Sequence, residues 1–438
     1  MQLKQFKNSY DIIVTGAGIA GISAASKAAS MGASVLLVEH YGFVGGMSAA
    51  GMVSPFMKSR TGNIDLVKGV FESLENGMQE LGGMIDNGFY AWAFRSVANN
   101  ILKQHQVDLA LNTDLVEAVT EGTKIVSVKL ASSYGIQTVS AKYFIDTSGD
   151  AQLVLMAGLP YAKGDENTGK LQAVTLFFRM GGINVEKTAQ YAKNNPTDFL
   201  PWMDFKFDFS KIISIAGYKS LIEKAKKENR LPQEIEYVFF TTLAGTGEGS
   251  FNCTNILGID PSYSDQLTKA EQIGHYQVAK ITDFLITDVP GFEHAFLIDT
   301  GVQIGVRETR RIIAEYMMTG NDVLNGARFN DVIGRACYGI DIHGQNGEKS
   351  RMEDLEEGSW YEIPLRSLLV KNIENVMGAG RCIGATREGH SALRIMPTSA
   401  ATGEACGVVT ALAAKLNIPI RMVPYNLIRK HLIHNIEN

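Results

Sequence analysis

A glycine-rich turn joins a short apolar run to a helix at the start of this chain. The run Tyr10–Thr15 is rich in β-branched residues, which predicts a buried strand. The turn Gly16-Ala-Gly18-Ile-Ala-Gly21 follows at once, and the Ala- and Ser-rich segment 22–31 has apolar residues at helical spacing. A second apolar run, 34–38, predicts another buried strand. This order of strand, glycine turn, helix and strand predicts a βαβ unit of a parallel sheet.

Each part of this unit has a physical role in binding a dinucleotide. Gly16 allows a tight turn, Gly18 lets the backbone approach a pyrophosphate, and Gly21 lets the helix pack closely on the sheet. The first helical turn, which contains Ala20, offers free N–H groups and a partial positive charge to phosphates. Glu39 ends the second strand 18 residues after the last glycine, where its carboxylate can accept hydrogen bonds from ribose hydroxyls. The alternative is an ordinary strand–helix turn without a ligand.

A second glycine segment follows the acid. The sequence Gly45-Gly46-Met47-Ser48 lets the backbone lie beside a long ligand that continues past the pyrophosphate, and His40 is expected to contact adenine. The first glycine turn alone does not distinguish NAD from FAD. Glu39 followed by this second turn resembles the FAD-binding start of flavoproteins with the glutathione-reductase-type fold.

Segments further along the chain are expected to complete the same site. Helices are predicted over 64–82 and 90–104, and short strands over 107–146, the last of which rejoins the first sheet. Backbone atoms near Val116 are expected to contact adenine. The residues after the last strand that are expected to contact the cofactor are Thr147, Gly149 and Asp150. Asp150 is equally interpreted as the N-cap of the short helix that follows, which is compatible with a cofactor role.

The C-terminal part contains a strand, 372–377, followed by Gly380 and Arg381, which are expected to contact the cofactor. A helix of small residues begins near Pro397 and Thr398, and small residues permit close backbone approach. We expect its N-terminal end to face the pyrimidine edge of a flavin, where the helix dipole favours negative charge. The alternative is a tightly packed closing helix that contacts no ligand.

The pattern changes between these two parts. Apolar runs at 174–178 and 236–243 predict strands of a different sheet, and 262–287 predicts a long amphipathic helix. The segment therefore has the mixed strands and helices of a second domain. The predicted division is 1–164 for the first part of the nucleotide-binding domain, 165–370 for an inserted substrate domain, and 371–438 for the closing part.

Five blocks together resemble, in chain order, the FAD-dependent oxidoreductases related to the flavoprotein subunits of fumarate reductase and succinate dehydrogenase. The blocks are the first glycine turn with Glu39, Gly45–Ser48, Asp146–Asp150, Gly305–Arg311, and Gly380–Cys382 with Arg394–Thr398. The resemblance implies an α/β fold, in which a three-layer Rossmann-like FAD-binding domain is interrupted by an α+β substrate domain. It also implies bound FAD. Because many members of this family have no assigned substrate, the resemblance identifies the cofactor better than the reaction.

Several function classes are disfavoured by what the sequence lacks. A second strand–GxGxxG–helix unit is missing, so a dedicated NAD(P)H domain is not expected, and the four cysteines form no CxxC motif for zinc or dithiol chemistry. The net charge of −5 argues against a general nucleic-acid binder, and no metal is expected. No apolar run reaches the ~18–20 residues of a membrane helix, and the N-terminus does not read as a signal peptide. We therefore expect a cytoplasmic protein.

Three side chains are candidates for catalysis. Arg307 follows an apolar run and is expected at a strand end, where it can bind a substrate carboxylate or the charge of a reduced flavin. His343, before a glycine turn, and His390, expected in a polar loop, can move a proton as hydride moves. The alternatives are a structural ion pair for Arg307 and surface or turn positions for both histidines. Two further histidines, His431 and His434, are expected on a solvated terminal face.

These residues predict an FAD-dependent oxidoreductase that exchanges a hydride between flavin N5 and a small organic substrate, with an unknown second electron donor or acceptor. An NAD-dependent enzyme, a flavin-dependent monooxygenase and a non-catalytic FAD-binding protein remain alternatives. The sequence indicates neither the substrate nor the direction of hydride transfer.

Overall fold

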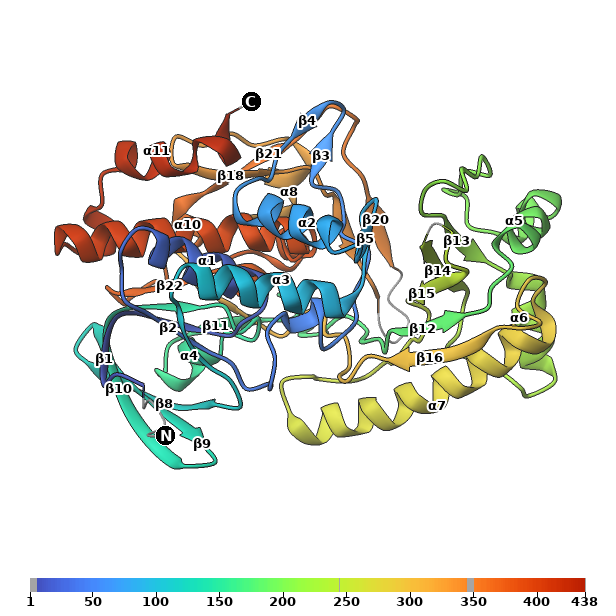
Figure 1. The fold of residues 1–438 in the computed structure, drawn as a ribbon, viewed down its shortest axis with the longest axis horizontal. Helices are drawn as coiled ribbons and strands as arrows, with labels where there is room; N and C mark the ends of the chain where they lie inside the picture. Colours follow the sequence, from blue (N-terminus) through green and yellow to red (C-terminus); the bar gives the residue numbers. More distant parts are fainter. Residues whose placement is uncertain (1–5, 244, 345–349, 438) are drawn as a thin grey trace.

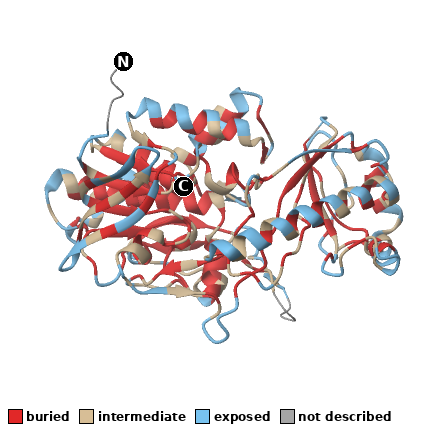
Figure 2. Cartoon of the chain, turned by 90° about the horizontal axis from the view of Figure 1, so that it is seen from below, coloured by how far each residue is buried: buried red, intermediate tan, exposed pale blue. Residues whose placement is uncertain are grey.

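The computed structural model describes residues 6–243, 245–344 and 350–437. Figure 1 shows two lobes: a larger one that contains both chain termini, and a smaller one formed by the middle of the chain. Each lobe has its own buried apolar core, and Figure 2 shows buried residues gathered in both.

The larger lobe is built on a seven-stranded sheet. Its path runs β7 (Asp108–Ala110), β2 (Val35–Val38), β1 (Ser9–Thr15), β10 (Gly135–Asp146), β9 (Lys124–Ser132) and β8 (Asp114–Glu121), and β22 (Val376–Gly378) also pairs with β10. Strands β7, β2, β1, β10 and β22 are parallel to one another, whereas β9 is antiparallel to both of its neighbours, β10 and β8. Parallel strands covered on both faces are typical of nucleotide-binding α/β domains.

The helices of this lobe are distributed along the chain. They are α1 (Ile19–Ser30), α2 (Val70–Glu80), α3 (Ala91–Gln104), α4 (Gln152–Met156), α8 (Gly320–Leu324), α9 (Arg387–Leu393), α10 (Met396–Leu416) and α11 (Tyr425–Ile436). Small two-stranded sheets complete the lobe: β3 (Arg60–Thr61) with β4 (Ile64–Asp65), β5 (Met84–Ile85) with β6 (Gly88–Phe89), β11 (Tyr161–Lys163) with β17 (Arg310–Ile312), β18 (Val332–Ala336) with β21 (Tyr361–Pro364), and β19 (Ile340–Ile342) with β20 (Arg351–Glu353). Each described helix is too short or too polar to traverse a lipid bilayer.

The register of the parallel strands brings three strand ends to one edge of the sheet. Thr15 lies opposite Asp146, and Asp146 lies opposite Gly378. Because parallel strands point the same way, the loops that follow β1, β10 and β22 leave the sheet side by side. These loops hold three of the glycine segments identified in the sequence.

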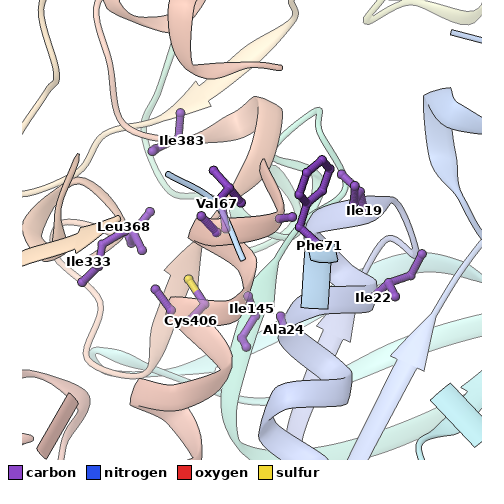
Figure 3. Close-up of a cluster of buried hydrophobic side chains, with 14 of the residues drawn as sticks. Ile19, Ile22, Ala24, Val67, Phe71, Ile145, Ile333, Leu368, Ile383 and Cys406 are labelled. Carbon is purple, nitrogen blue, oxygen red and sulfur yellow. The ribbon is translucent and has the colours of Figure 1, made fainter. Parts of the chain in front are cut away.

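Helices α1 and α10 pack with their backbones in direct contact. A Cβ atom on Gly403 would lie 2.1 Å from the carbonyl oxygen of Ala20, and one on Gly407 would lie 2.4 Å from that of Ala24. Figure 3 shows Ile22 and Ala24 of α1, Ile145 of β10 and Cys406 of α10 in the same buried cluster. The small residues of α10 therefore let this late helix pack directly against the first helix of the chain.

The smaller lobe is an antiparallel sheet covered by helices. The strand order is β13 (Ser214–Gly217), β14 (Val238–Leu243), β15 (Glu248–Phe251), β12 (Phe178–Gly181) and β16 (Phe296–Thr300). Its helices are α5 (Val185–Asn194), α6 (Lys219–Lys227) and α7 (Ser264–Asp288). The separate core of this lobe runs from Val174 to Val306, whereas Met318 to Leu369 belong to the core of the larger lobe. The packing therefore favours bounds of 174–306 for the inserted domain over the predicted 165–370.

Several predicted elements agree with the structure. The first two strands and the intervening helix form as expected, and the long helix predicted over 262–287 is α7. The helix predicted over 64–82 is shorter, because the chain forms β4 and then turns at Gly69, which has a φ of 67°, before α2 begins. The predicted strand 174–178 contributes only isolated bridges until β12 begins at Phe178.

Two local predictions near the candidate catalytic residues are wrong. Arg307 does not end a strand, because the segment before it forms only one isolated bridge, between Thr175 and Gly305. The predicted polar loop around His390 is helix α9, capped by the Thr386 hydroxyl, which accepts a hydrogen bond from the Gly389 N–H. Its Arg387 side chain is buried and pairs with the buried Glu308 carboxylate, so polarity did not indicate exposure.

The contact between α1 and α10 generates a stability prediction. We expect Gly403→Ala to lower the free energy of unfolding by about 1–3 kcal/mol, since the new methyl group meets the Ala20 carbonyl and the helices must separate. Urea unfolding followed by circular dichroism measures the change. The control is Lys415→Ala at the exposed end of α10, which should stay within about 0.5 kcal/mol of the wild type. Equal stability of the two variants would contradict the role of this contact.

Candidate functional site

The glycine turn after β1 is shaped by contacts that only glycine allows. Gly16 has a φ of 93°, and a Cβ atom there would lie 2.6 Å from the Cα of Ser148. A Cβ atom on Gly21 would lie 1.8 Å from the carbonyl oxygen of Gly16. The turn therefore holds the start of α1 against the β1 and β10 loops, and the Thr147 hydroxyl adds hydrogen bonds to the carbonyl oxygens of Thr15 and Gly16, both at 2.9 Å.

Two glycine segments form a cradle at the N-terminus of α1. Gly18 is the N-cap residue and no side chain caps the helix. A Cβ atom on Gly18 would lie 3.9 Å from the Cα of Gly46, whose own φ of 49° suits glycine. The first-turn N–H groups and the helix dipole therefore face a space that backbone atoms line, which is the arrangement that binds phosphates.

Glu39 is buried where β2 ends. Its carboxylate accepts hydrogen bonds from the backbone N–H groups of Ala17 at 2.7 Å and Tyr41 at 3.0 Å. One oxygen is also 3.8 Å from Nε2 of His40, which is exposed. Each carboxylate oxygen can accept more than one hydrogen bond, so Glu39 can hold the glycine turn and still accept a ligand hydroxyl.

The loop after β10 is tied to the loop after β22. Asp150 accepts a hydrogen bond from the Thr309 hydroxyl at 2.6 Å and forms a 2.9 Å ion pair with Arg381. Gly149 has a φ of 76°, and a Cβ atom there would lie 2.8 Å from the Arg381 guanidinium. The alternative interpretation of Asp150 as a helix N-cap is wrong, because α4 begins after Ala151.

Asp146 supports this loop from below. Its buried carboxylate accepts hydrogen bonds from the Ser148 N–H at 3.1 Å, the Ser148 hydroxyl at 2.7 Å and the Val154 N–H at 3.1 Å. Burial raises the pKa of Asp146, although these hydrogen bonds act in the opposite direction. The Asp146 side chain does not line the cavity, so its role is to shape the loop.

A single continuous cavity of about 1940 Å³ contains the cradle and extends to the inserted domain. Ligand pockets commonly hold roughly 300–1,000 Å³, so there is room for a long cofactor and a second molecule. The predicted cofactor residues that line it are Gly16, Gly18, Ala20, Glu39, His40, Gly45, Gly46, Met47, Ser48, Thr147, Gly149, Asp150, Gly380 and Arg381. Four predicted cofactor residues do not line it: Gly21, Val116, Pro397 and Thr398.

These four residues lie near the cavity in different ways. Gly21 acts through packing, and Val116 is 41% exposed while its neighbour Leu115 reaches the cavity. Pro397 and Thr398 are buried in the first turn of α10, whose Met396 and Ser399 reach the cavity instead. The buried Thr398 hydroxyl has no hydrogen-bond partner in the described part of the chain.

A cluster of charged side chains lines the cavity beyond the cradle. The Asp341 carboxylate lies 3.2 Å from Nε2 of His343 and forms a 3.2 Å ion pair with Arg394. It also accepts a hydrogen bond from the Tyr338 hydroxyl at 2.9 Å. Arg307 lies in the same cavity and donates to the carbonyl oxygen of Ala173 at 2.6 Å.

The charges of this cluster shift one another's pKa values. Burial raises the pKa of Asp341, but His343, Arg394 and Arg307 outweigh burial and hold it well below its usual range. Burial and the charge of Arg307 lower the pKa of His343, despite the opposing effect of Asp341. Burial and the charge of Arg394 lower the pKa of Arg307 to about 10. At neutral pH both arginines are cations, Asp341 is an anion and His343 is neutral.

His390 is separated from this cluster. It is fully buried and does not line the cavity, and its Nε2 lies 2.7 Å from the carbonyl oxygen of Arg381. Burial, with the charges of Arg311 and Arg394, lowers its pKa well below the usual value. His390 therefore supports the loop that carries Arg381, and its predicted contact with substrate is not supported.

Two further charged or titratable residues, Arg311 and His434, form ion pairs with buried carboxylates. Arg311 is fully buried and forms ion pairs with Glu166 and Glu308, as expected of a structural residue. His431 is exposed, as predicted, whereas His434 is only partly exposed and lies 3.1 Å from the buried Glu404 carboxylate. That carboxylate also binds Lys27 at 2.8 Å, which joins α11, α10 and α1.

Four residues were not assigned a role in the site from the sequence: Thr309, Tyr338, Asp341 and Arg394, of which Thr309 and Arg394 fell only within the blocks that resemble the family. Asp341 precedes His343 by two residues in a strand-like pattern, so their side chains share one side of the chain. That spacing was the available signal for the pair. The meeting of Thr309 with Asp150 across the fold carried no sequence signal.

Comparison with known proteins identifies the family. The family profile described as FAD dependent oxidoreductase matches residues 11–432. The chain belongs to the FAD-dependent oxidoreductase family. Its cofactor is therefore FAD, and the fold class expected from the sequence is confirmed.

Similarity to individual proteins is more distant. The tRNA uridine 5-carboxymethylaminomethyl modification enzyme MnmG of Streptococcus thermophilus is 30% identical over 203 residues, which cover 42% of this chain and 30% of that enzyme. Among solved structures, the flavin-dependent brominase Bmp2 aligns over 96% of this chain and 82% of its own, with a TM-score of 0.51 and 12% identity. A geranylgeranyl bacteriochlorophyll reductase-like protein from Thermoplasma acidophilum aligns over 98% and 86%, with a TM-score of 0.48 and 14% identity. The brominase is similar to this chain in fold.

The geometry of this chain suits FAD. The uncapped N-terminus of α1 and the facing glycines Gly18 and Gly46 provide space that a side chain would occupy, as a pyrophosphate requires. The Glu39 carboxylate lies directly after β2, at the position where nucleotide-binding βαβ units place an acid for ribose hydroxyls. In the first turn of α10, Ser399 lines the same cavity. Polar groups for the two ends of an extended cofactor thus lie around one cavity.

Removing the acid of the cradle should weaken cofactor binding. We expect Glu39→Ala to raise the Kd for FAD by about 10–100-fold, because charged hydrogen bonds contribute about 1.5–3 kcal/mol each and the Ala17 N–H loses its acceptor. Quenching of FAD fluorescence during reconstitution measures the Kd. The control is Glu117→Ala, an exposed acid on β8, which should leave the Kd unchanged. A Kd equal in both variants would contradict the assignment.

Proposed function

We propose that this protein exchanges a hydride between flavin N5 of bound FAD and a small organic substrate held by Arg307, with His343 moving the accompanying proton. The observation that carries the proposal is that Arg307 and His343 line the same cavity as the glycine cradle. When bound, FAD supplies a ring system that accepts or donates a hydride. The chain itself must bind the substrate, orient it and handle one proton.

His343 is suited to the proton because Asp341 sets its tautomer. A contact of 3.2 Å between Asp341 and Nε2 favours the hydrogen on Nε2, since the carboxylate is ionised and can only accept. Nδ1 then carries the lone pair and can take a proton from a substrate hydroxyl or amine as hydride leaves. In the reverse direction the same nitrogen returns the proton. Asp341 orients the ring and stabilises its protonated form.

Arg307 is suited to substrate binding because no ion pair within the described residues neutralises its positive charge. Its guanidinium donates to the backbone at Ala173, and among the described residues it forms no ion pair with a carboxylate. The neighbouring Arg394 is paired with Asp341. A guanidinium with free donors lining a cavity is a typical anchor for an anionic or strongly accepting group.

A small molecule is a better candidate than RNA for this site, although the matched Streptococcus enzymes are named for tRNA modification. The net charge of −5 provides no general attraction for phosphates.

The cytoplasm is the proposed location. The four cysteines are free and buried, which suits a reducing compartment.

The first test is the cofactor and its response to substrates. We expect the purified protein to be yellow and to release FAD on denaturation, because most of the residues proposed to contact FAD line one cavity of this chain. Anaerobic addition of carboxylic acids, alcohols, amines and nicotinamides should bleach the flavin with one class of organic substrate. Bound nicotinamide in place of flavin would favour an NAD-dependent enzyme, and a flavin that no reductant bleaches would favour a non-catalytic protein. Oxygen consumption that requires NAD(P)H and gives a hydroxylated product would favour a monooxygenase.

The second test is the pH dependence of substrate oxidation. Because burial and Arg307 lower the pKa of His343, the neutral base persists below the ordinary histidine pKa of about 6.5. We therefore expect kcat/KM to be retained from neutral pH down to that value, and to fall only as more acidic solution protonates the ring. His343→Gln should lower kcat by about 10²–10⁴-fold and remove this acidic limb. The control is His275→Gln on the exposed face of α7. An unchanged pH profile in His343→Gln would contradict the assigned role.

A further inference from the structure

The inserted sheet presents one face to its own core and the other to the shared cavity. On β14, Val238 and Phe240 are fully buried in the core of the inserted domain. The alternating residues Tyr237, Phe239 and Thr241 line the cavity. Because successive side chains of a strand point to opposite faces, this alternation assigns one face of β14 to the cavity.

Neighbouring strands follow the same alternation. Phe178, Ile215 and Phe251 are core residues, whereas their chain neighbours Phe177, Ser214 and Asn252 line the cavity. Trp202 also lines the cavity. Its indole lies edge-on to the Phe239 ring, and the two ring centroids are 6.1 Å apart. The part of the cavity wall that the inserted domain supplies therefore contains several aromatic rings, with hydroxyl and amide groups among them.

The charge of the cavity provides the second part of the argument. Arg307 and Arg394 contribute two cations, Asp341 contributes one anion, and His343 is neutral, so this cluster carries one uncompensated positive charge. The cavity lining includes other carboxylates. Among them, Glu353 pairs with Arg351 at 2.5 Å, Asp354 pairs with Lys58 at 3.3 Å, and Glu236 is exposed. One negative charge on the ligand would neutralise the cluster.

We propose that the substrate is a monoanionic carboxylic acid with an aromatic body, whose carboxylate pairs with Arg307 and whose ring lies against Tyr237 and Phe239. This inference rests on the proposed function, because it names the substrate class of that same site. Two half-buried aromatic rings on the sheet face provide the apolar contact, and the uncompensated guanidinium provides the charge. Small aliphatic acids satisfy only the charge, and neutral aromatic compounds satisfy only the rings.

The test measures binding directly. Isothermal titration calorimetry of the purified protein with phenylacetate, cinnamate and indole-3-acetate is compared with acetate and with phenylacetamide. We expect at least one of the three aromatic acids to bind about tenfold or more tightly than both acetate and phenylacetamide. Calorimetry reports binding with or without flavin, so the result does not depend on turnover.

Two variants separate the parts of the site. Phe239→Ala should weaken the aromatic acid by about tenfold and leave acetate unchanged, since only the ring contact is removed. Arg307→Gln should remove the preference for the acid over phenylacetamide. The control is Phe209→Ala, an exposed aromatic residue of the inserted domain that does not line the cavity. Circular dichroism spectra that match the wild type establish that each variant is folded.

The outcomes distinguish this inference from the proposed function. Flavin-loaded protein that binds none of the aromatic acids, or binds them no better than acetate, overturns the inference and leaves hydride exchange standing. Equal binding of phenylacetate and phenylacetamide overturns the role of Arg307. Protein that binds aromatic acids with the expected variant effects but never takes up flavin supports the inference and overturns the proposed function.

Discussion

The direct backbone contact between α1 and α10 is the constraint on which the rest of the structure depends. Gly403 and Gly407 leave no atom between α10 and the carbonyl oxygens of Ala20 and Ala24. The contact holds the first nucleotide-binding helix in place from the other end of the chain. It also brings the first turn of α10 to the cavity that the uncapped N-terminus of α1 faces. Residues separated by more than 350 positions thereby line one site.

Charge placement divides the site into two regions. Around the cradle, Glu39 accepts backbone N–H groups and Asp150 is held by Arg381, so the acids there shape loops. Beyond it, Asp341 is ionised because cations surround it, and it both orients His343 and pairs with Arg394. Arg307 remains as the cation available to a ligand. The first region suits a cofactor, and the second suits proton and anion chemistry.

Local patterns predicted much of the fold and most of the cofactor cradle. The strand, glycine turn, helix and acid near the N-terminus depend on residues close together in the chain, so periodicity and turn chemistry suffice. The predicted bounds of elements were wrong where tertiary contacts compete with propensity. One example is the helix predicted from residue 64, where the chain forms β4 and turns at Gly69. His390 was misplaced because its polar neighbours are paired in the interior, which depends on distant partners such as Glu308.

By itself, the sequence determined that this chain has a dinucleotide-binding βαβ unit with an acid at the ribose position, since steric and hydrogen-bonding demands of that unit act over about thirty residues. Only the tertiary structure decided which polar side chains meet in the cavity. Arg307 and Arg394 converge from separate segments on the neighbouring pair Asp341 and His343, and His390 is buried outside the cavity although it carries the same ring as His343. Burial and pairing depend on the packing of whole elements, and local sequence does not encode them.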